Sequence, residues 1–506
     1  MAVEESRYRS AGYVWRQRVG FPLGVGLCAL ILVLPTPEGL ASEAQRAGAV
    51  AALMATWWVT EAVPIAVTAL VPLVLYPVLS VMDMSQAAAP YADPNVFLFM
   101  GGFMIAMAME KWGLHKRLGL HVIAWVGGGP QRILWGFMAA TGFISMWVSN
   151  TATAVMMLPV AMAVLAHLHP GTPAPGEKIQ FGTVLMLGIA YAASVGGVAT
   201  LIGTPPNVIF AGQAKALFPE LGEVTFVRWM LFAFPVALGF LMIVWAYLAF
   251  FYARLEKGSA APPHAIQEEL KALGPWTNGE RGVMAVFALT AAAWMGRADV
   301  PIGPVTLPGW PTLVGLRGIH DGTIAMAAAL VLFATPISFR KVDFLLDWSW
   351  AKRLPWDVLL LLGGGFALAE SFRRTGLDAW MGSRMEILQG IPIPVLIFVV
   401  CLGVAVVGNL ISNTAIAAML IPMAASAAGA LKVHPYLLMI PATLAASFDF
   451  MLPAGTPPNA IVYGTGYVTI PQMVRAGLGL TVLGAVWITL ATYLFVIPVF
   501  GVGPVP

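Results

Sequence analysis

The sequence is poor in charge. Only 10% of its 506 side chains are Asp, Glu, Lys or Arg, against roughly 25% in soluble domains, and 59% are apolar. So few charges could not cover a water-soluble surface, and we expect an all-α polytopic membrane protein. Apolar stretches of about 17–25 residues, long enough to cross a bilayer, predict about eleven transmembrane helices. They lie near residues 18–36, 46–62, 63–82, 93–110, 180–202, 227–251, 280–296, 320–338, 355–372, 434–452 and 476–500.

Cysteine is equally scarce. The chain has two, Cys28 and Cys401, both in apolar stretches, which excludes a disulfide framework and a thiolate metal site. The seven histidines fall mainly near span ends or in loops, without the spacing of a metal site. Because the net charge is only +3 and basic residues sit at span ends, nucleic acid is not expected as a partner. We therefore expect no cofactor.

Basic residues predict the orientation of the chain. Four basic residues precede the first span: Arg7, Arg9, Arg16 and Arg18. That span lacks a cleavage signature, and we interpret it as a retained helix. The positive-inside rule then places the N-terminus in the cytoplasm and the C-terminus outside. Three basic residues disagree with this orientation, and we expect them on an amphipathic segment at the outer interface: Arg373, Arg374 and Arg384.

The sequence contains an internal repeat. The sequence Ser-Asn-Thr-Ala at 149–152 recurs at 412–415, and Gly-Gly-Phe at 101–103 recurs at 364–366, both with an offset of 263. A constant offset over some tens of residues is hard to produce by chance, and it indicates two homologous halves.

A second phrase repeats with a different offset. Gly-Thr-Pro-Pro-Asn occurs at 203–207 and again at 455–459, an offset of 252. The first half therefore has a longer loop between its two motifs. We place that loop at 168–180, where proline and glycine are frequent.

Each Ser-Asn-Thr triplet is predicted to form the tip of a re-entrant hairpin, at 131–167 and 392–430. About 15 residues on either side of the triplet rise only about 22 Å as helix, short of the roughly 30 Å hydrocarbon core. If both hairpins return to their own side, five spans separate equivalent points of the halves, and the repeat is inverted.

The expected organisation follows from the repeat. N-terminal spans, mainly scaffold, occupy 1–92, repeat 1 occupies 93–251, a cytoplasmic loop occupies 252–281, scaffold spans with an interfacial segment occupy 282–354, and repeat 2 occupies 355–506.

The two Ser-Asn-Thr triplets and the two Gly-Thr-Pro-Pro-Asn phrases form four polar breaks in apolar sequence, and they indicate a ligand site. Consecutive prolines cannot continue a helix, and unwound backbone at membrane depth is tolerated only inside protein or beside a wet cavity. Helix N-termini suit carboxylate oxygens, and freed carbonyls with Ser or Asn oxygens suit a hard cation. No Lys, Arg, Asp or Glu occurs in 134–166, 184–210 or 393–431. A bound anion there needs compensation, which co-bound cations provide.

Each signal has a plainer reading. A single Ser-Asn-Thr in a membrane helix usually makes interhelical hydrogen bonds, and a lone Pro-Pro is usually a kink. Duplication of both phrases in the same order favours a site. Glu61 and Glu110, near span ends, read as structural. Asp449 lies six residues before Gly455 in an apolar run, and it is either a functional acid that couples transport or merely hydrogen-bonded; both interpretations stay open.

Four segments of the sequence resemble the divalent anion:sodium symporter family of di- and tricarboxylate and sulfate transporters, and the resemblance covers nearly the whole chain. They are Thr-Glu-Ala-Val-Pro at 60–64, Met-Gly-Gly-Phe at 100–103, Ser-Met-Trp-Val-Ser-Asn-Thr at 145–151 and Phe-Met-Leu-Pro-Ala-Gly-Thr-Pro-Pro-Asn at 450–459. The resemblance implies a homodimer in a bacterial inner membrane. It also implies a scaffold domain and a transport domain with both hairpins that moves as an elevator.

The resemblance also implies site residues. Substrate would be faced by Ser149, Asn150, Thr151, Thr204, Ser412, Asn413, Thr414 and Thr456. One sodium ion would use Ser145, Ser149, Asn150 and Gly203, and a second would use Gly408, Ile411, Asn413 and Gly455. Many relatives have Thr-Glu where this chain has Gly408-Asn409. The second cation site lacks that hydroxyl and is expected to be the weaker one.

The sequence therefore predicts a sodium-coupled symporter of small di- or tricarboxylates such as succinate, malate, fumarate or citrate. A sodium-independent dicarboxylate exchanger and a sulfate transporter of the same fold remain alternatives. A channel would be expected to conduct without saturating, and a membrane enzyme would need a nucleophile or metal cluster that the sequence does not offer.

Overall fold

The structure is a computed structural model, and it is mostly helical. It describes residues 11–126, 129–168, 180–253, 264–302, 305–316, 318–338, 343–385 and 389–502. Nearly all of the expected loop at 168–180 lies outside the described residues, as do Arg7, Arg9 and part of the expected loop at 252–281.

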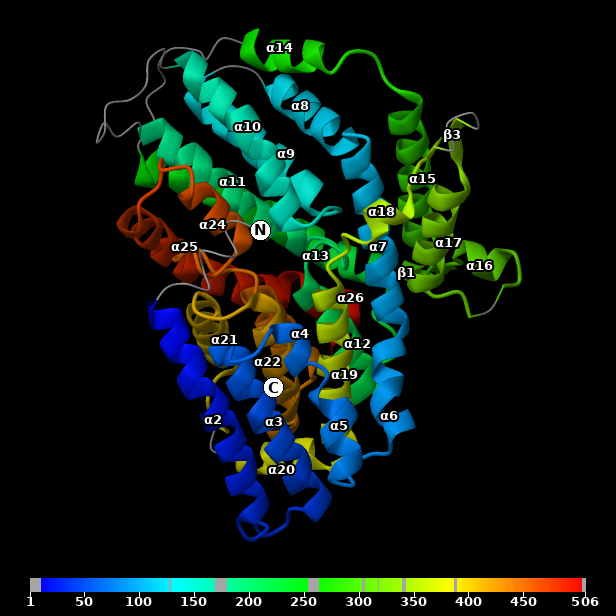
Figure 1. Ribbon diagram of the computed structural model, residues 1–506, viewed down its shortest axis with the longest axis vertical. Helices are drawn as coiled ribbons and strands as arrows, with labels where there is room; N and C mark the ends of the chain where they lie inside the picture. Colours follow the sequence, from blue (N-terminus) through cyan, green and yellow to red (C-terminus); the bar gives the residue numbers. More distant parts are fainter. Residues whose placement is uncertain are drawn as a thin grey trace.

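The N-terminal region contains a long helix pair followed by a broken span. Helices α2 and α3 pack along one another, in the lower part of Figure 1. The expected span at 63–82 is interrupted, because Pro64 and Pro72 each begin a new short helix. The elements are α2 Ala11–Val33, α3 Ser42–Thr60, α4 Ile65–Thr68, α5 Val71–Val78, α6 Met84–Ala88 and η1 Ala89–Ala92.

The first repeat begins with α7 and ends in a π-helical turn. Its elements are α7 Pro94–Lys111, α8 Leu114–Val126, α9 Pro130–Ser145, α10 Asn150–Leu168, α11 Gln180–Val198, α12 Pro205–Leu217, η2 Pro219–Leu221, α13 Phe226–Ala246 and η3 Tyr247–Tyr252.

The middle region adds two short sheets, so the expectation of an all-α chain is wrong in this detail. Branched side chains at 300, 302 and 305 favour strands, and Pro301 excludes a helix there. Each sheet is an antiparallel pair, β1 with β2 and β3 with β4. The elements are α14 His264–Ala272, α15 Asn278–Met295, β1 Val300–Ile302, β2 Val305–Leu307, α16 Trp310–Leu313, α17 Asp321–Ala334, β3 Pro336–Ser338, β4 Asp343–Phe344 and α18 Trp348–Ala351.

The second repeat follows the same order as the first. Its elements are α19 Trp356–Thr375, α20 Leu377–Arg384, α21 Ile393–Gly408, α22 Asn413–Ala430, α23 Tyr436–Ala445, α24 Pro457–Tyr463, α25 Ile470–Ala491, η5 Thr492–Val496 and α26 Ile497–Phe500. A π-helical turn therefore ends the long helix of both repeats, after α13 and after α25.

The two repeats interlock. Helix α12 of the first packs against α22 and α23 of the second, and α24 of the second packs against α10 and α11 of the first. In Figure 1 the first hairpin, α9 and α10, lies in the upper half of the molecule and the second, α21 and α22, lies in the lower half. Each repeat thus covers the other, which buries the segments between their helices.

Both Ser-Asn-Thr triplets interrupt a helix pair, which confirms the predicted break. The first arms, α9 and α21, have 16 residues each, as expected. The second arms are longer than expected, because Pro159 and Pro422 are accommodated inside them. Helix α22 has 18 residues, about 27 Å, so length alone no longer argues that this arm is re-entrant. Re-entrance stays a prediction.

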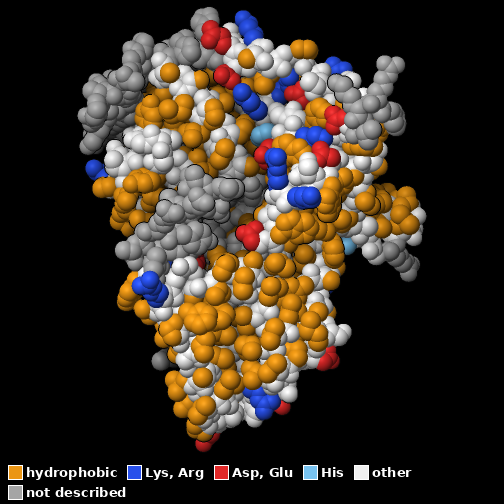
Figure 2. Space-filling view, viewed as in Figure 1, with side chains coloured by type: hydrophobic (Ala, Val, Ile, Leu, Met, Phe, Trp, Pro, Cys, Tyr) orange, Lys and Arg blue, Asp and Glu red, His pale blue; other side chains and the backbone are white. Residues whose placement is uncertain are grey.

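The described helices fit a membrane by length and composition. Five are long and apolar enough to cross it, within Trp15–Val33, Met84–Lys111, Phe226–Tyr252, Asn413–Ala430 and Ile470–Phe500, and six shorter apolar helices accompany them. In Figure 2, apolar side chains cover most of the lower part of the visible face, and charged side chains gather near its top and its lower tip. The expected number of eleven spans stays a prediction.

Candidate functional site

The first hairpin tip brings Ser145 and Asn150 together. Ser145 Oγ lies 2.6 Å from Asn150 Oδ1 and 2.7 Å from the carbonyl oxygen of Ala193 on α11. A hydroxyl has one proton, so it can donate to only one of these oxygens. The other contact then joins two oxygen lone pairs, an arrangement that a small cation would stabilise.

The first unwound segment, residues 199–204, returns to the same tip. A Cβ at Gly197 would overlap Asn150 Oδ1 and lie 3.1 Å from the carbonyl oxygen of Gly203. These residues touch because Gly197 and Gly203 have no side chains. Three of the residues expected at the first sodium site, Ser145, Asn150 and Gly203, are therefore gathered in the structure.

Asn207 holds the first unwound segment in place. Its Nδ2 lies within hydrogen-bond distance of the carbonyl oxygens of Gly197, at 3.2 Å, Val198, at 3.2 Å, and Thr200, at 2.6 Å. The Thr200 hydroxyl donates to the carbonyl oxygen of Met146, at 2.5 Å. Side chains thus replace the helical hydrogen bonds that the Pro-Pro pair removes.

The second tip is built around Asp449. Asn413 Nδ2 donates to Asp449 Oδ1 at 3.2 Å, and a Cβ at Gly455 would lie 2.8 Å from Asp449 Oδ2. A Cβ at Gly408 would lie 3.4 Å from Asp449 Cβ. Gly408, Asn413 and Gly455, all expected at the second sodium site, therefore surround this one carboxylate.

Two asparagines hold the second unwound segment, residues 446–456. Asn459 Nδ2 donates to the carbonyl oxygens of Asp449, at 3.2 Å, and Leu452, at 3.1 Å. Asn409 Oδ1 accepts from the backbone amides of Met451, at 2.7 Å, and Leu452, at 3.1 Å. The tip and the unwound segment are joined in both repeats, although by different side chains.

The other expected residues lie at helix starts. Ser149 Oγ accepts from the backbone amide of Ala152, at 3.3 Å, and Thr456 Oγ1 accepts from that of Asn459, at 3.3 Å. Thr204 and Thr414 are buried, and Thr151 is exposed. Ser412 lies at the N-terminus of α22, where its side chain makes no capping hydrogen bond. Ile411 is buried, and its backbone amide donates to Gly408, at 3.4 Å.

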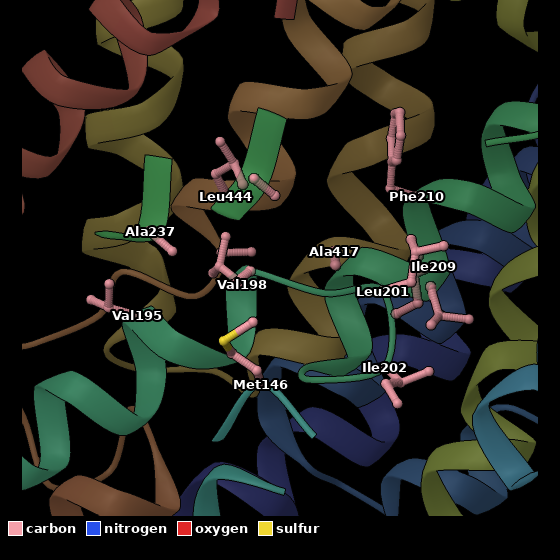
Figure 3. Packing of buried hydrophobic residues seen from close by; sticks show 14 of the residues in the cluster. Met146, Val195, Val198, Leu201, Ile202, Ile209, Phe210, Ala237, Ala417 and Leu444 are labelled. Carbon is pink, nitrogen blue, oxygen red and sulfur yellow. The ribbon is translucent and has the colours of Figure 1, made fainter. Parts of the chain in front are cut away.

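The tips of the two repeats are tied together by a shared core. Figure 3 shows Met146 of the first tip packed in one cluster with Val198 and Leu201, beside Ala417 of α22. Deeper in α12, Gln213 Nε2 donates across the repeats to the carbonyl oxygens of Gly365, at 3.1 Å, and Ala418, at 3.0 Å. The four polar breaks therefore belong to one packed unit.

Several buried oxygens at these breaks lack a partner. In the described parts of the chain they include the Oδ1 atoms of Asn207, Asn413 and Asn459 and Asp449 Oδ2. Buried acceptors without donors are costly, and cations would satisfy them. The buried ion pairs lie on other elements: Arg117 with Glu280, and Arg297 with Asp321. Among the described residues no group of three His, Cys, Asp or Glu side chains could hold a metal ion.

Sequence reasoning did not nominate Asn207, Asn459 or Asn409. A signal was present for the first two, because the asparagine repeats with the Pro-Pro pair in both halves. The carbonyls that these amides bind become free only when the preceding helix unwinds. Their role is therefore visible in the folded chain and not in the phrase itself.

The comparisons with known proteins agree with the resemblance. Residues 19–502 match the sodium:sulfate symporter transmembrane region. The sodium-dependent dicarboxylate transporter SdcS of Staphylococcus saprophyticus is 40% identical over 491 residues, which are 96% of this chain and 92% of that protein. SdcS of Staphylococcus aureus is 38% identical over 488 residues, 96% of this chain and 92% of that protein.

Two solved structures share the fold. The YdaH transporter of Alcanivorax borkumensis aligns over 97% of this chain and 98% of its own, with a TM-score of 0.53 and 14% identity. MtrF of Neisseria gonorrhoeae aligns over 94% of this chain and 95% of its own, with a TM-score of 0.55 and 12% identity. At this identity the likeness concerns the fold alone.

Proposed function

The chain belongs to the sodium:sulfate symporter family, and from this premise we propose that it is a secondary transporter that carries small dicarboxylates together with sodium ions. The dicarboxylate transporters among its relatives favour dicarboxylates over sulfate, and their dependence on sodium favours symport over sodium-independent exchange. The observation that carries the proposal is the pair of tips, each with unpaired or crowded oxygens on segments whose own sequence carries no Lys or Arg.

The proposal places the substrate carboxylates and the sodium ions at different parts of each polar break. The N-termini of α10 and α22 present free amides and a positive dipole end, and that of α12, which begins with two prolines, presents the dipole end alone; both features suit the carboxylates of the substrate. The oxygens between the helices suit sodium, which would supply the positive charge that these segments do not. Because the dicarboxylate is negative and sodium is positive, each ligand favours binding of the other, and the coupling is reciprocal.

We assign substrate contacts to Ser149, Asn150, Thr151, Thr204, Ser412, Asn413, Thr414 and Thr456. We assign one sodium ion to Ser145, Ser149, Asn150 and Gly203, and a second to Gly408, Ile411, Asn413 and Gly455. The gathering of these residues at two tips supports the assignment.

The same proposal covers the assembly and its movement. We propose a homodimer in a bacterial inner membrane, with the N-terminus in the cytoplasm and the C-terminus outside. A transport domain with both hairpins moves against a scaffold of N-terminal and middle spans. The interlocked packing of α12 and α24 supports a rigid transport domain, because the two repeats could move only as one body.

Uptake into proteoliposomes tests the function. Labelled succinate should accumulate with an inward sodium gradient and fail to accumulate when choline replaces sodium. Unlabelled dicarboxylates should compete, and sulfate should compete weakly. Equal uptake in choline that requires succinate inside the vesicles would instead identify an exchanger.

A further inference from the structure

The two tips differ at one pair of equivalent positions. With the offset of the tips, Ser145 corresponds to Gly408, and with the offset of the unwound segments, Gly197 corresponds to Asp449. The first repeat thus has a side-chain oxygen on its hairpin and a glycine near the end of α11, just before its unwound segment. The second repeat has the reverse arrangement.

The exchanged positions are neighbours in space: Ser145 and Gly197 both adjoin Asn150 in the first repeat, and Gly408 adjoins Asp449 in the second. In the first repeat, Gly197 must lack a side chain because Asn150 Oδ1 occupies the space where its Cβ would lie. In the second repeat, Asp449 packs beside Gly408, and its Cβ would make an ordinary van der Waals contact, at 3.4 Å, with a Cβ at that position. Each tip therefore has one oxygen-bearing side chain at the exchanged positions. In the first tip it is the neutral hydroxyl of Ser145, on the hairpin, and in the second tip it is the carboxylate of Asp449, on the unwound segment.

The Asp449 carboxylate needs a positive partner. Its side chain is 0% exposed, and its Oδ2 has no hydrogen-bond partner in the described parts of the chain. The sequence has no Lys or Arg from residue 385 to 431 or from 433 to 474, which includes both segments of the second tip. Arg16 of α2 does reach this tip, but its Nη1 donates to the carbonyl oxygen of Leu410, at 3.3 Å, and its Nη2 pairs with Glu61. A buried and unpaired carboxylate is prohibitively costly.

A bound cation satisfies this tip better than a proton does. Protonation would neutralise the carboxylate but would leave Asn413 Oδ1, also buried and without a partner, unsatisfied. Carboxylate and amide oxygens are ligands that hard cations accept together. Asn413 already contacts the same carboxylate through its Nδ2, at 3.2 Å, so both unpartnered oxygens belong to one tip.

We propose that Asp449 is a direct ligand of the second sodium ion and gives that site a fixed negative charge, so that it binds sodium without substrate. The inference rests on the proposed sodium coupling. The first site has only neutral oxygens, from Ser145, Asn150 and backbone, and its sodium affinity depends on the charge of the bound dicarboxylate. Sodium binds first at the second tip. The missing hydroxyl at Gly408 therefore does not make this the weaker site.

Sodium-dependent stabilisation of the purified protein tests the proposal without transport. Thermal unfolding of the full chain is followed by tryptophan fluorescence in a sodium chloride series, with choline chloride holding the ionic strength constant. Without dicarboxylate, sodium should raise the unfolding temperature of the wild type. In Asp449→Asn, the sodium concentration for half of this effect should rise at least about tenfold, because even the loss of an outer-shell partner costs 10- to 100-fold in metal affinity.

Two further variants keep the test decisive. Thr443→Val, an isosteric change at a buried position of α23, should leave the sodium response unchanged. The double variant Gly408→Ser/Asp449→Gly gives the second tip the arrangement of the first, and its response to sodium should appear only when succinate is present. The double variant decides the question if Asp449→Asn does not fold, because a response without succinate in that variant overturns the proposal.

The outcomes separate the inference from the function. An unchanged sodium response in Asp449→Asn, with sodium-dependent succinate uptake intact in the wild type, overturns the role of Asp449 alone. A wild type that sodium does not stabilise, even with succinate, and that takes up succinate equally in choline overturns the proposed function, and the inference falls with it.

Discussion

Two adjacent glycines should respond in different ways to the same substitution. Gly196 on α11 faces Gly142 on α9, and a Cβ there would overlap the Gly142 carbonyl and lie 2.5 Å from its Cα. Ordinary contact needs about 3.4 Å, so Gly196→Ala must move two packed helices apart by about 1 Å. Overpacking of this kind costs about 1–3 kcal/mol, and the unfolding temperature of a chain this long should fall by about 1–3 °C.

Gly197→Ala meets a side chain instead. Its Cβ would overlap Asn150 Oδ1, which can rotate away, at a cost of about 0.5–1.5 kcal/mol for a strained rotamer. The rotation breaks the 2.6 Å contact between Ser145 and Asn150, in the proposed first sodium site. The sodium concentration for half-maximal succinate uptake should therefore rise about tenfold or more.

The assay compares both variants with a matched control. Gly403→Ala, on α21, introduces a methyl group with no atom within 4 Å and should change neither quantity. Unfolding temperature is read by tryptophan fluorescence in detergent, and sodium dependence by uptake. Equal losses of thermal stability in Gly196→Ala and Gly197→Ala, or unchanged sodium dependence in Gly197→Ala, would refute the reasoning.

Three further predictions concern polar side chains. Asn207→Ala and Asn459→Ala should each lose about 2–4 kcal/mol of stability, because an amide NH₂ donates at most two hydrogen bonds and two buried carbonyls lose their donors. Thermal unfolding measures the loss, and wild-type stability in both variants would contradict the prediction. Thr151→Ala and Thr414→Ala should raise the succinate KM several-fold at unchanged unfolding temperature, and unchanged KM in both would remove them from the substrate site. Asp321→Asn should destabilise the chain by about 1–3 kcal/mol, because it removes the buried partner of Arg297 and leaves that guanidinium only the half-buried Glu223; a wild-type unfolding temperature would show that this ion pair does not hold the fold.

The breaks in the fold could be predicted from the sequence because proline acts locally. The Pro-Pro pairs forced the unwinding before α12 and α24, and the structure confirms it. The triplets likewise marked the starts of α10 and α22. The length of the second arms could not be predicted, since whether Pro422 ends or only bends a helix depends on tertiary packing around it.

The organisation of each tip was less predictable. The sequence identifies Asp449 as an intramembrane acid, but the residues that flank it do not indicate that it faces Gly408. The contact depends on the unwound segment folding back toward the hairpin, which local sequence does not encode. Comparison of the two repeats at their separate offsets carries that information, because the serine and the glycine change together.

The interlocked packing of the repeats has a consequence for synthesis at the ribosome. Helix α10 is covered by α24, which begins roughly 300 residues later, and at about 5–20 residues per second this partner emerges some 15–60 s after α10. During that interval the polar tip of the first hairpin sits in the insertion machinery or the bilayer without its cover. The nascent first half is therefore the stage at which quality-control proteases would recognise this chain, and slower translation of the second half would lower its yield.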